Sequence, residues 1–154
     1  MTVLELGINL GSKNIFERKY YSTSNNPLDP NLRAGFLSAL ESFTSEVFGD
    51  DVNVVSLASF KLVCYSEMIS LPLSEEEDDN SQPLLFYAII EKGTDAEIVK
   101  KELINISRTF LNRFSRNDIF AKKKKYFEKK FTSRIDDILG DLKLKTEDRF
   151  RSIF

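Results

Sequence analysis

The N-terminal ten residues constrain the fold most, because their apolar side chains fall at every second position. This period places the side chains on one face of an extended strand: Leu4, Leu6, Ile8 and Leu10. The segment 11–14 then supplies turn residues, and residues 15–21 resume with branched and aromatic side chains that favour strands. The sequence therefore predicts a half-buried N-terminal hairpin, which needs a sheet to complete it.

A helix is predicted between Asp29 and Gly49. The Asp29-Pro30 step offers an N-cap followed by proline at the first helical position, and Gly49 supplies a stop. The apolar residues between them recur at spacings of three to five: Leu32, Phe36, Leu37, Leu40, Phe43, Val47 and Phe48. Arg33 and Glu41 belong to the other, polar face, so one side of this helix is expected to pack on the core.

Three more strands are predicted at residues 52–57, 60–67 and 84–91. Each stretch is too short for an independent helix and is dense in branched, aromatic and leucine residues. The acidic run Glu75–Asp79 lies between the second and the third and is flanked by prolines, so it is expected to form an extended hairpin loop.

Two helices are predicted after the last strand. Asp95 can cap the first, which has an apolar stripe up to Ser115: Ile98, Val99, Leu103, Ile106, Phe110, Leu111 and Phe114. Asn117-Asp118 can cap the second, which Gly140 ends or bends: Ile119, Phe120, Phe127, Phe131, Ile135, Ile138 and Leu139 form its stripe. We therefore expect one domain over residues 1–140 and a helical extension or tail over residues 141–154.

Residue types missing from the chain argue against catalysis. The 154 residues include no histidine, which removes the usual general base, the commonest metal ligand and the Ser-His and Cys-His pairs. The single cysteine, Cys64, lies in an apolar run and is expected to be a buried side chain. No glycine-rich phosphate loop is present. We expect no enzyme activity, cofactor or metal, and the lack of an N-terminal signal or long apolar run favours a cytoplasmic protein.

Charge is distributed unevenly along the chain. The formal net charge is −2, but residues 1–99 carry 6 basic and 16 acidic residues, whereas residues 100–154 carry 16 basic and 8 acidic. The basic residues gather on the last predicted helix: Lys122, Lys123, Lys124, Lys125, Lys129 and Lys130. Such a cationic amphipathic helix can meet an anionic membrane or an acidic partner, or its charged side can simply face solvent. The acidic first 99 residues and the pI of about 5.3 argue against nucleic acid.

The predicted order is strand, strand, helix, strand, strand, strand, helix, helix, and it resembles the longin domain. The segments Gly11–Arg18 and Leu32–Gly49 carry the best local likeness. The resemblance implies an α+β fold with a five-stranded antiparallel sheet; profilin-like sensor domains are the nearest alternative. It also implies a homodimer, or a heterodimer with a second longin- or roadblock-like chain. The binding face would use the first helix and third strand, for which the candidate residues are Arg33, Glu41, Val52 and Val54.

Three functions remain open from the sequence. The first is a non-catalytic protein-interaction module of a membrane-trafficking or small-GTPase regulatory system, with a small GTPase or a similar domain as partner. The second is a peripheral protein that binds anionic membranes through the basic helix. The third is a small-ligand sensor or an enzyme, for which the sequence offers no candidate residues.

Overall fold

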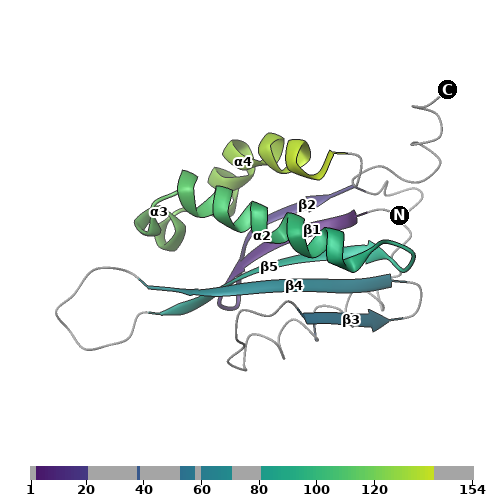
Figure 1. Ribbon diagram of the computed structural model, residues 1–154. Helices are drawn as coiled ribbons and strands as arrows, with labels where there is room; N and C mark the ends of the chain where they lie inside the picture. The colour runs from purple at the N-terminus through teal and green to yellow at the C-terminus, as the bar shows by residue number, and fades with distance from the viewer. Residues whose placement is uncertain (1–2, 21–37, 39–52, 58–59, 71–80, 141–154) are drawn as a thin grey trace.

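An antiparallel sheet with three helices on one face makes up the described part of the protein (Figure 1). The computed structural model describes residues 3–20, 38, 53–57, 60–70 and 81–140. Its strands are β1 (Val3–Leu10), β2 (Lys13–Lys19), β3 (Asn53–Leu57), β4 (Phe60–Ile69) and β5 (Gln82–Glu91), in the order β2-β1-β5-β4-β3. Four of them have 7 to 10 residues and form most of the sheet, whereas the five-residue β3 lies at the outer edge of β4.

The strand β1 is buried on both faces, not on one. Residues of either parity are buried along this central strand, and even Glu5 is fully buried. The register shifts between Val3 and Glu5, and for this reason Val3, and not Leu4, joins the cluster on the helix side. A strict alternation in the sequence could not show this irregularity.

The helices are α2 (Ala96–Arg113), α3 (Arg116–Ala121) and α4 (Lys124–Leu139). Asp95 caps α2 as predicted, since its side chain accepts a hydrogen bond from the Glu97 backbone N–H at 2.9 Å. Gly140 follows α4 with a φ of 53°, a left-handed conformation that glycine adopts without strain, so the predicted helix end is also confirmed.

The predicted single helix from Asn117 to Gly140 is wrong. Ser115 caps α3 by accepting a bond from the Asp118 N–H at 3.1 Å, and the chain leaves the helical conformation at Lys122 and Lys123 before α4 begins. Neither glycine nor proline marks this break, so the apolar periodicity gave no sign of it.

The predicted fold is therefore wrong in its element order. Three helices follow β5 where two were expected, and β3 contributes only five residues, at one edge of the sheet. The helix predicted between Asp29 and Gly49 lies outside the described residues apart from Ser38, which is helical. The fold itself gives no family-level support for the longin resemblance.

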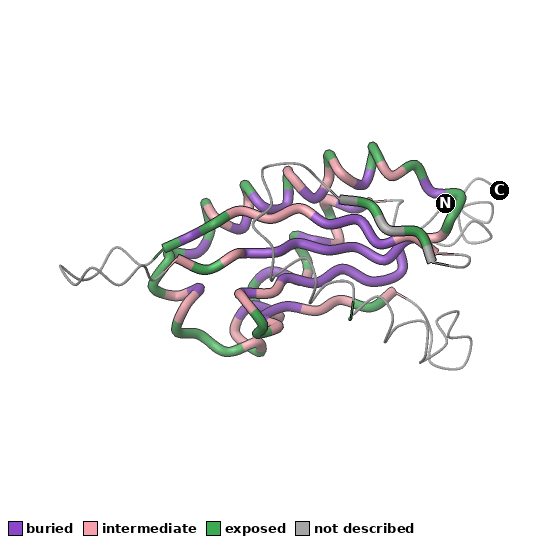
Figure 2. The backbone as a smooth tube through the Cα atoms, turned by 90° about the horizontal axis from the view of Figure 1, so that it is seen from below, coloured by how far each residue is buried: buried purple, intermediate pink, exposed green. Residues whose placement is uncertain are grey.

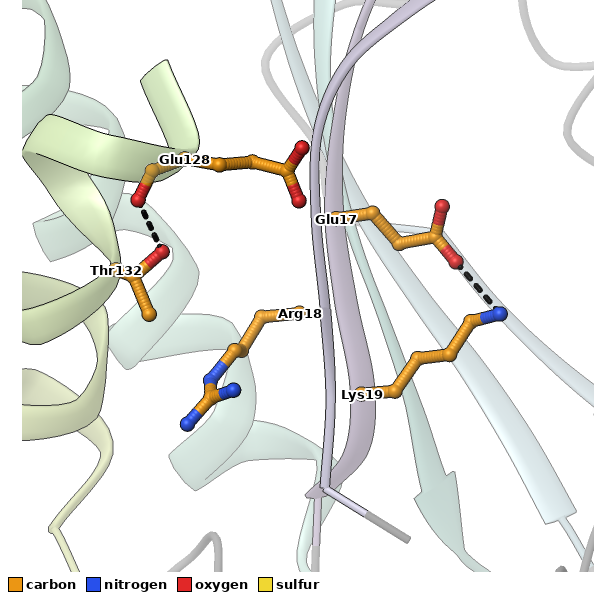
Figure 3. Close-up of a pocket in the computed structure, with 5 residues that line it drawn as sticks. All are labelled: Glu17, Arg18, Lys19, Glu128 and Thr132. Atoms are coloured by element: carbon orange, nitrogen blue, oxygen red, sulfur yellow. Dashed lines mark hydrogen bonds and ion pairs between the residues drawn. The ribbon is translucent and has the colours of Figure 1, made fainter. Parts of the chain in front are cut away.

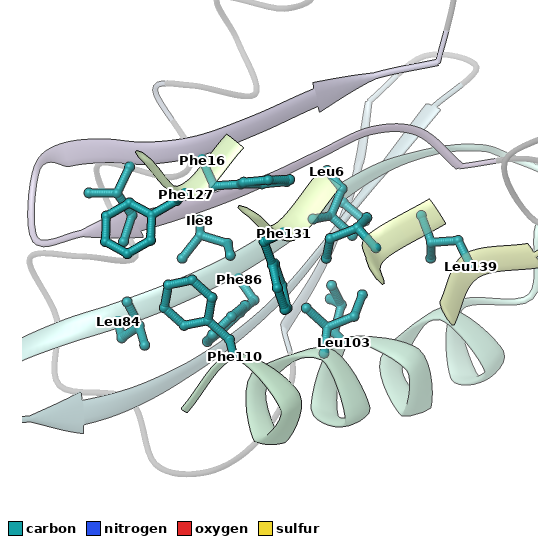
Figure 4. Packing of buried hydrophobic residues seen from close by; sticks show 14 of the residues in the cluster. Leu6, Ile8, Phe16, Leu84, Phe86, Leu103, Phe110, Phe127, Phe131 and Leu139 are labelled. Carbon is teal, nitrogen blue, oxygen red and sulfur yellow. The ribbon is translucent and has the colours of Figure 1, made fainter. Parts of the chain in front are cut away.

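An aromatic cluster holds the helices on the sheet (Figure 4). Phe110 of α2 lies at its centre, with ring centroids 4.9 to 6.0 Å from those of its neighbours: Phe86, Phe114, Phe127 and Phe131. Such edge-on and tilted contacts stabilise by about 0.5–1.5 kcal/mol per pair beyond the buried area. The central strands are buried along most of their length (Figure 2). This core fixes the orientation of α4 and hence the position of its charged side.

Candidate functional site

The six lysines predicted as a binding surface gather at one end of the helical layer. We call them the basic face: Lys122, Lys123, Lys124, Lys125, Lys129 and Lys130. Lys122 and Lys123 link α3 to α4, and the others lie in the first half of α4. All are exposed except Lys124, which is half-buried. The structure therefore brings the predicted residues together.

The apolar side of α4 is buried in the core. Phe127, Phe131 and Ile135 are completely buried, and Leu139 is nearly so. An amphipathic helix that enters a membrane must offer such a side to the lipid. Because the stripe of α4 is buried in this fold, it cannot insert into a membrane as long as the core is intact.

Tyr126 organises part of the basic face. The Nζ atoms of Lys122 and Lys130 lie 5.3 and 5.2 Å from the centroid of the Tyr126 ring. The ring in turn packs edge-on against Phe114 and Phe127. Each exposed cation–π contact contributes about 0.5–1 kcal/mol. These contacts anchor two of the cationic groups to the buried aromatic cluster.

The N-terminal end of α4 carries positive charge, which is unfavourable at a helix N-terminus. Lys123 is the N-cap and makes no side-chain capping bond, and the first turn holds lysines and no acidic residue. A helix N-terminus bears partial positive charge, so each cation here costs about 0.3–1 kcal/mol. An anionic group brought to this end of α4 would relieve the repulsion.

Lys124 has a structural role within the basic face. Its Nζ donates to the Glu17 carboxylate of β2 at 2.9 Å, and Lys19 pairs with the same carboxylate at 3.0 Å. Burial raises the pKa of Glu17, but the hydrogen bonds and charges of Lys124 and Lys19 outweigh it and lower the pKa to about 2. Lys124 thus fastens α4 to β2, which leaves five exposed lysines for a partner.

A groove of about 370 Å³ runs between β2 and α4 (Figure 3). Its lining is mixed in charge: Glu17, Arg18, Lys19, Glu128 and Thr132. Arg18 binds Asp136 of α4 through two hydrogen bonds of 3.1 and 3.2 Å, and the Tyr20 hydroxyl donates to the same carboxylate. Arg18 pairs with Asp136 across the groove, and Glu17 pairs with Lys124 of α4, so these side chains mainly join the strand to the helix.

The second predicted surface lies elsewhere. Arg33, Glu41 and Val52 are outside the described residues, so their predicted role stays a prediction. Val54 is on β3 and is 48% exposed. Because β3 and β2 are opposite edges of the sheet and α4 packs against β2, Val54 and the basic face belong to separate surfaces.

Sequence reasoning missed the groove between α2 and α4. It has a volume of about 400 Å³ and is lined by Thr109, Asn112, Arg113 and Arg134. These residues belong to the polar sides of two helices, and only the relative rotation of α2 and α4 brings them together. No spacing in the sequence predicts that these four residues lie close together.

Other chemistry finds little support in the described residues. Cys64 is buried, and burial raises the pKa of its thiol to about 12, so the nucleophilic thiolate is scarce at neutral pH. Within the described ranges, no three side chains of the metal-binding types gather into a possible metal site. No described helix has the length and apolar character needed to cross a membrane. No protein-family model matches the chain, and no curated protein matches it either.

Proposed function

We propose that the protein is a non-catalytic interaction module whose basic face docks on an acidic surface of a protein partner. The observation that carries this proposal is the exposure of five lysines, three on α4 and two in the link before it, while the apolar side of α4 is buried in the core. The unfavourable charge at the start of α4 supports it, because docking of an anionic surface would offset that charge.

The small binding free energy expected at a membrane favours an acidic protein as the partner. Each lysine close to an anionic membrane contributes about 1 kcal/mol, so five contribute about 5 kcal/mol, a dissociation constant on the order of 0.2 mM. With the apolar stripe of α4 buried, lipid insertion adds nothing to this value. A protein partner can add shape complementarity and contacts to the half-buried ring of Tyr126.

The setting we propose is a membrane-trafficking or small-GTPase regulatory system, with a small GTPase or a second longin- or roadblock-like chain as partner. The support for this setting is the resemblance of Gly11–Arg18 and Leu32–Gly49 to longin sequences. The candidates Arg33, Glu41, Val52 and Val54 are the corresponding second surface, through which the chain would dimerise.

Affinity purification with a charge-neutralised variant tests the proposal. Lys125, Lys129 and Lys130 are replaced by glutamine, and the matched control replaces three exposed cations on other elements: Lys13, Lys101 and Arg108. We expect the wild type and the control to retain a partner that the first variant loses, and binding to weaken with salt. Equal retention by both variants would contradict the role of the basic face. Salt-sensitive binding to phosphatidylserine vesicles, lost in the first variant and without any protein partner, would assign a membrane function instead.

A further inference from the structure

The groove between α2 and α4 gathers hydrogen-bond donors from two helices. Arg113 and Asn112 come from the end of α2, and Arg134 comes from the middle of α4. None of the lining residues is acidic, and no ion pair among the described residues includes either arginine. Two like charges therefore border one open volume, and its described lining holds no carboxylate.

The donors differ in what they can offer to a ligand. The Thr109 hydroxyl donates to the Asn105 carbonyl oxygen at 2.9 Å, so its proton is already used. The Arg113 guanidinium lies over the Phe114 ring, 5.8 Å from its centroid, which restrains this group beside the groove. The donors left for a ligand are the two guanidinium groups and the Asn112 amide.

The geometry points to a binding site for a phosphate dianion, free or as a small monoester, held between Arg113 and Arg134. A single guanidinium satisfies a carboxylate through two parallel bonds, whereas a tetrahedral phosphate has enough oxygens to accept from both groups at once. Its two negative charges match the two positive ones. At roughly 30 Å³ per water, a volume of about 400 Å³ has room for a phosphate group with part of its hydration shell. This site goes beyond the proposed protein-docking function and is separate from the basic face.

Titration of the full chain with inorganic phosphate, followed by NMR, tests this site. We expect saturable shifts of the Thr109–Arg113 and Arg134 amides that sodium chloride at equal ionic strength does not produce. Arg134→Gln should weaken phosphate binding about tenfold or more, because a charge-assisted contact is lost. A parallel titration with glycerol 3-phosphate distinguishes the two ligand forms, since tighter binding than inorganic phosphate identifies the monoester.

The matched control is Lys101→Gln, which removes one positive charge from an exposed position of α2, the other helix that borders the groove. It should change phosphate affinity less than twofold, because Lys101 neither lines the groove nor belongs to the basic face. Glutamine is a good helix former, so neither variant should disturb its helix. Shifts that chloride reproduces, or equal affinity of Arg134→Gln and the wild type, would overturn the proposal.

Discussion

Gly7 of β1 lies directly opposite Tyr87 of β5, and the tyrosine ring occupies the space in which a side chain at residue 7 would stand. Tyr87 is itself buried, at 2% exposure, so the ring has little room to move aside. The pair sets the close packing of this part of the sheet, because only glycine leaves space for the ring on a central strand.

Gly7→Ala should therefore destabilise the protein. The added Cβ overlaps the Tyr87 ring, and overpacking of this kind costs about 1–3 kcal/mol. Urea unfolding measures the loss. Gly93→Ala is the matched control, because a Cβ there meets nothing within 4 Å, and it should leave the free energy of unfolding unchanged or slightly higher. Equal effects of the two substitutions would show that the ring does not confine Gly7.

The ion pair between Glu17 and Lys124 should make stability depend on pH in the acid range. The folded-state pKa of Glu17, about 2, lies below its ordinary value of 4.5. The contribution of this carboxylate is therefore complete above pH 4.5 and is lost as pH falls toward 2. The difference in pKa corresponds to about 3 kcal/mol. Because Lys124 and Lys19 are 38% and 45% exposed, we expect about 1–2 kcal/mol after solvent screening.

Urea unfolding of the wild type and Glu17→Gln at several pH values measures this contribution. The variant should be less stable at pH 6, and the difference should shrink between pH 4.5 and 2. Lys124→Gln should remove part of the same pH dependence, since it takes away the largest partner of Glu17. Parallel stability curves for the wild type and Glu17→Gln across this range would contradict the assignment.

Several elements could be predicted because local chemistry determines them. Asp95 caps a helix wherever a helix follows it, and Gly140 tolerates a positive φ that other residues avoid. The lysines 122–130 lie close together in sequence, so any helix brings them to one end of the molecule. These local signals do not depend on how the elements pack.

Features that depend on packing could not be predicted. Arg18 and Asp136 are 118 residues apart, and nothing in either segment indicates the other. The apolar stripe predicted for α2 included Ile98, which is 45% exposed, because the stripe is wider than the surface that the sheet covers. Two other features also depend on tertiary packing: the helix break at Lys122 and Lys123, and the burial of β1 on both faces.

Cys64 should react only when the protein opens. Its thiol is buried, and the pKa is raised to about 12 by that burial, so both access and thiolate are lacking at pH 8. A disulfide exchange reagent should label it slowly in buffer and completely in concentrated urea. Cys64 is the only cysteine, so the signal needs no mutagenesis. Rapid and complete labelling in buffer would contradict its place in the core.

The central claim is that the exposed lysines of the basic face dock on an acidic partner. Lysine acetylation of the free chain and of its complex with the co-purified partner, read by mass spectrometry, tests it directly. Lys125, Lys129 and Lys130 should react several-fold more slowly in the complex, while the exposed Lys13 and Lys101 keep their rates. If the three lysines react at the same rate in the complex as in the free chain, the partner binds elsewhere and the claim is wrong.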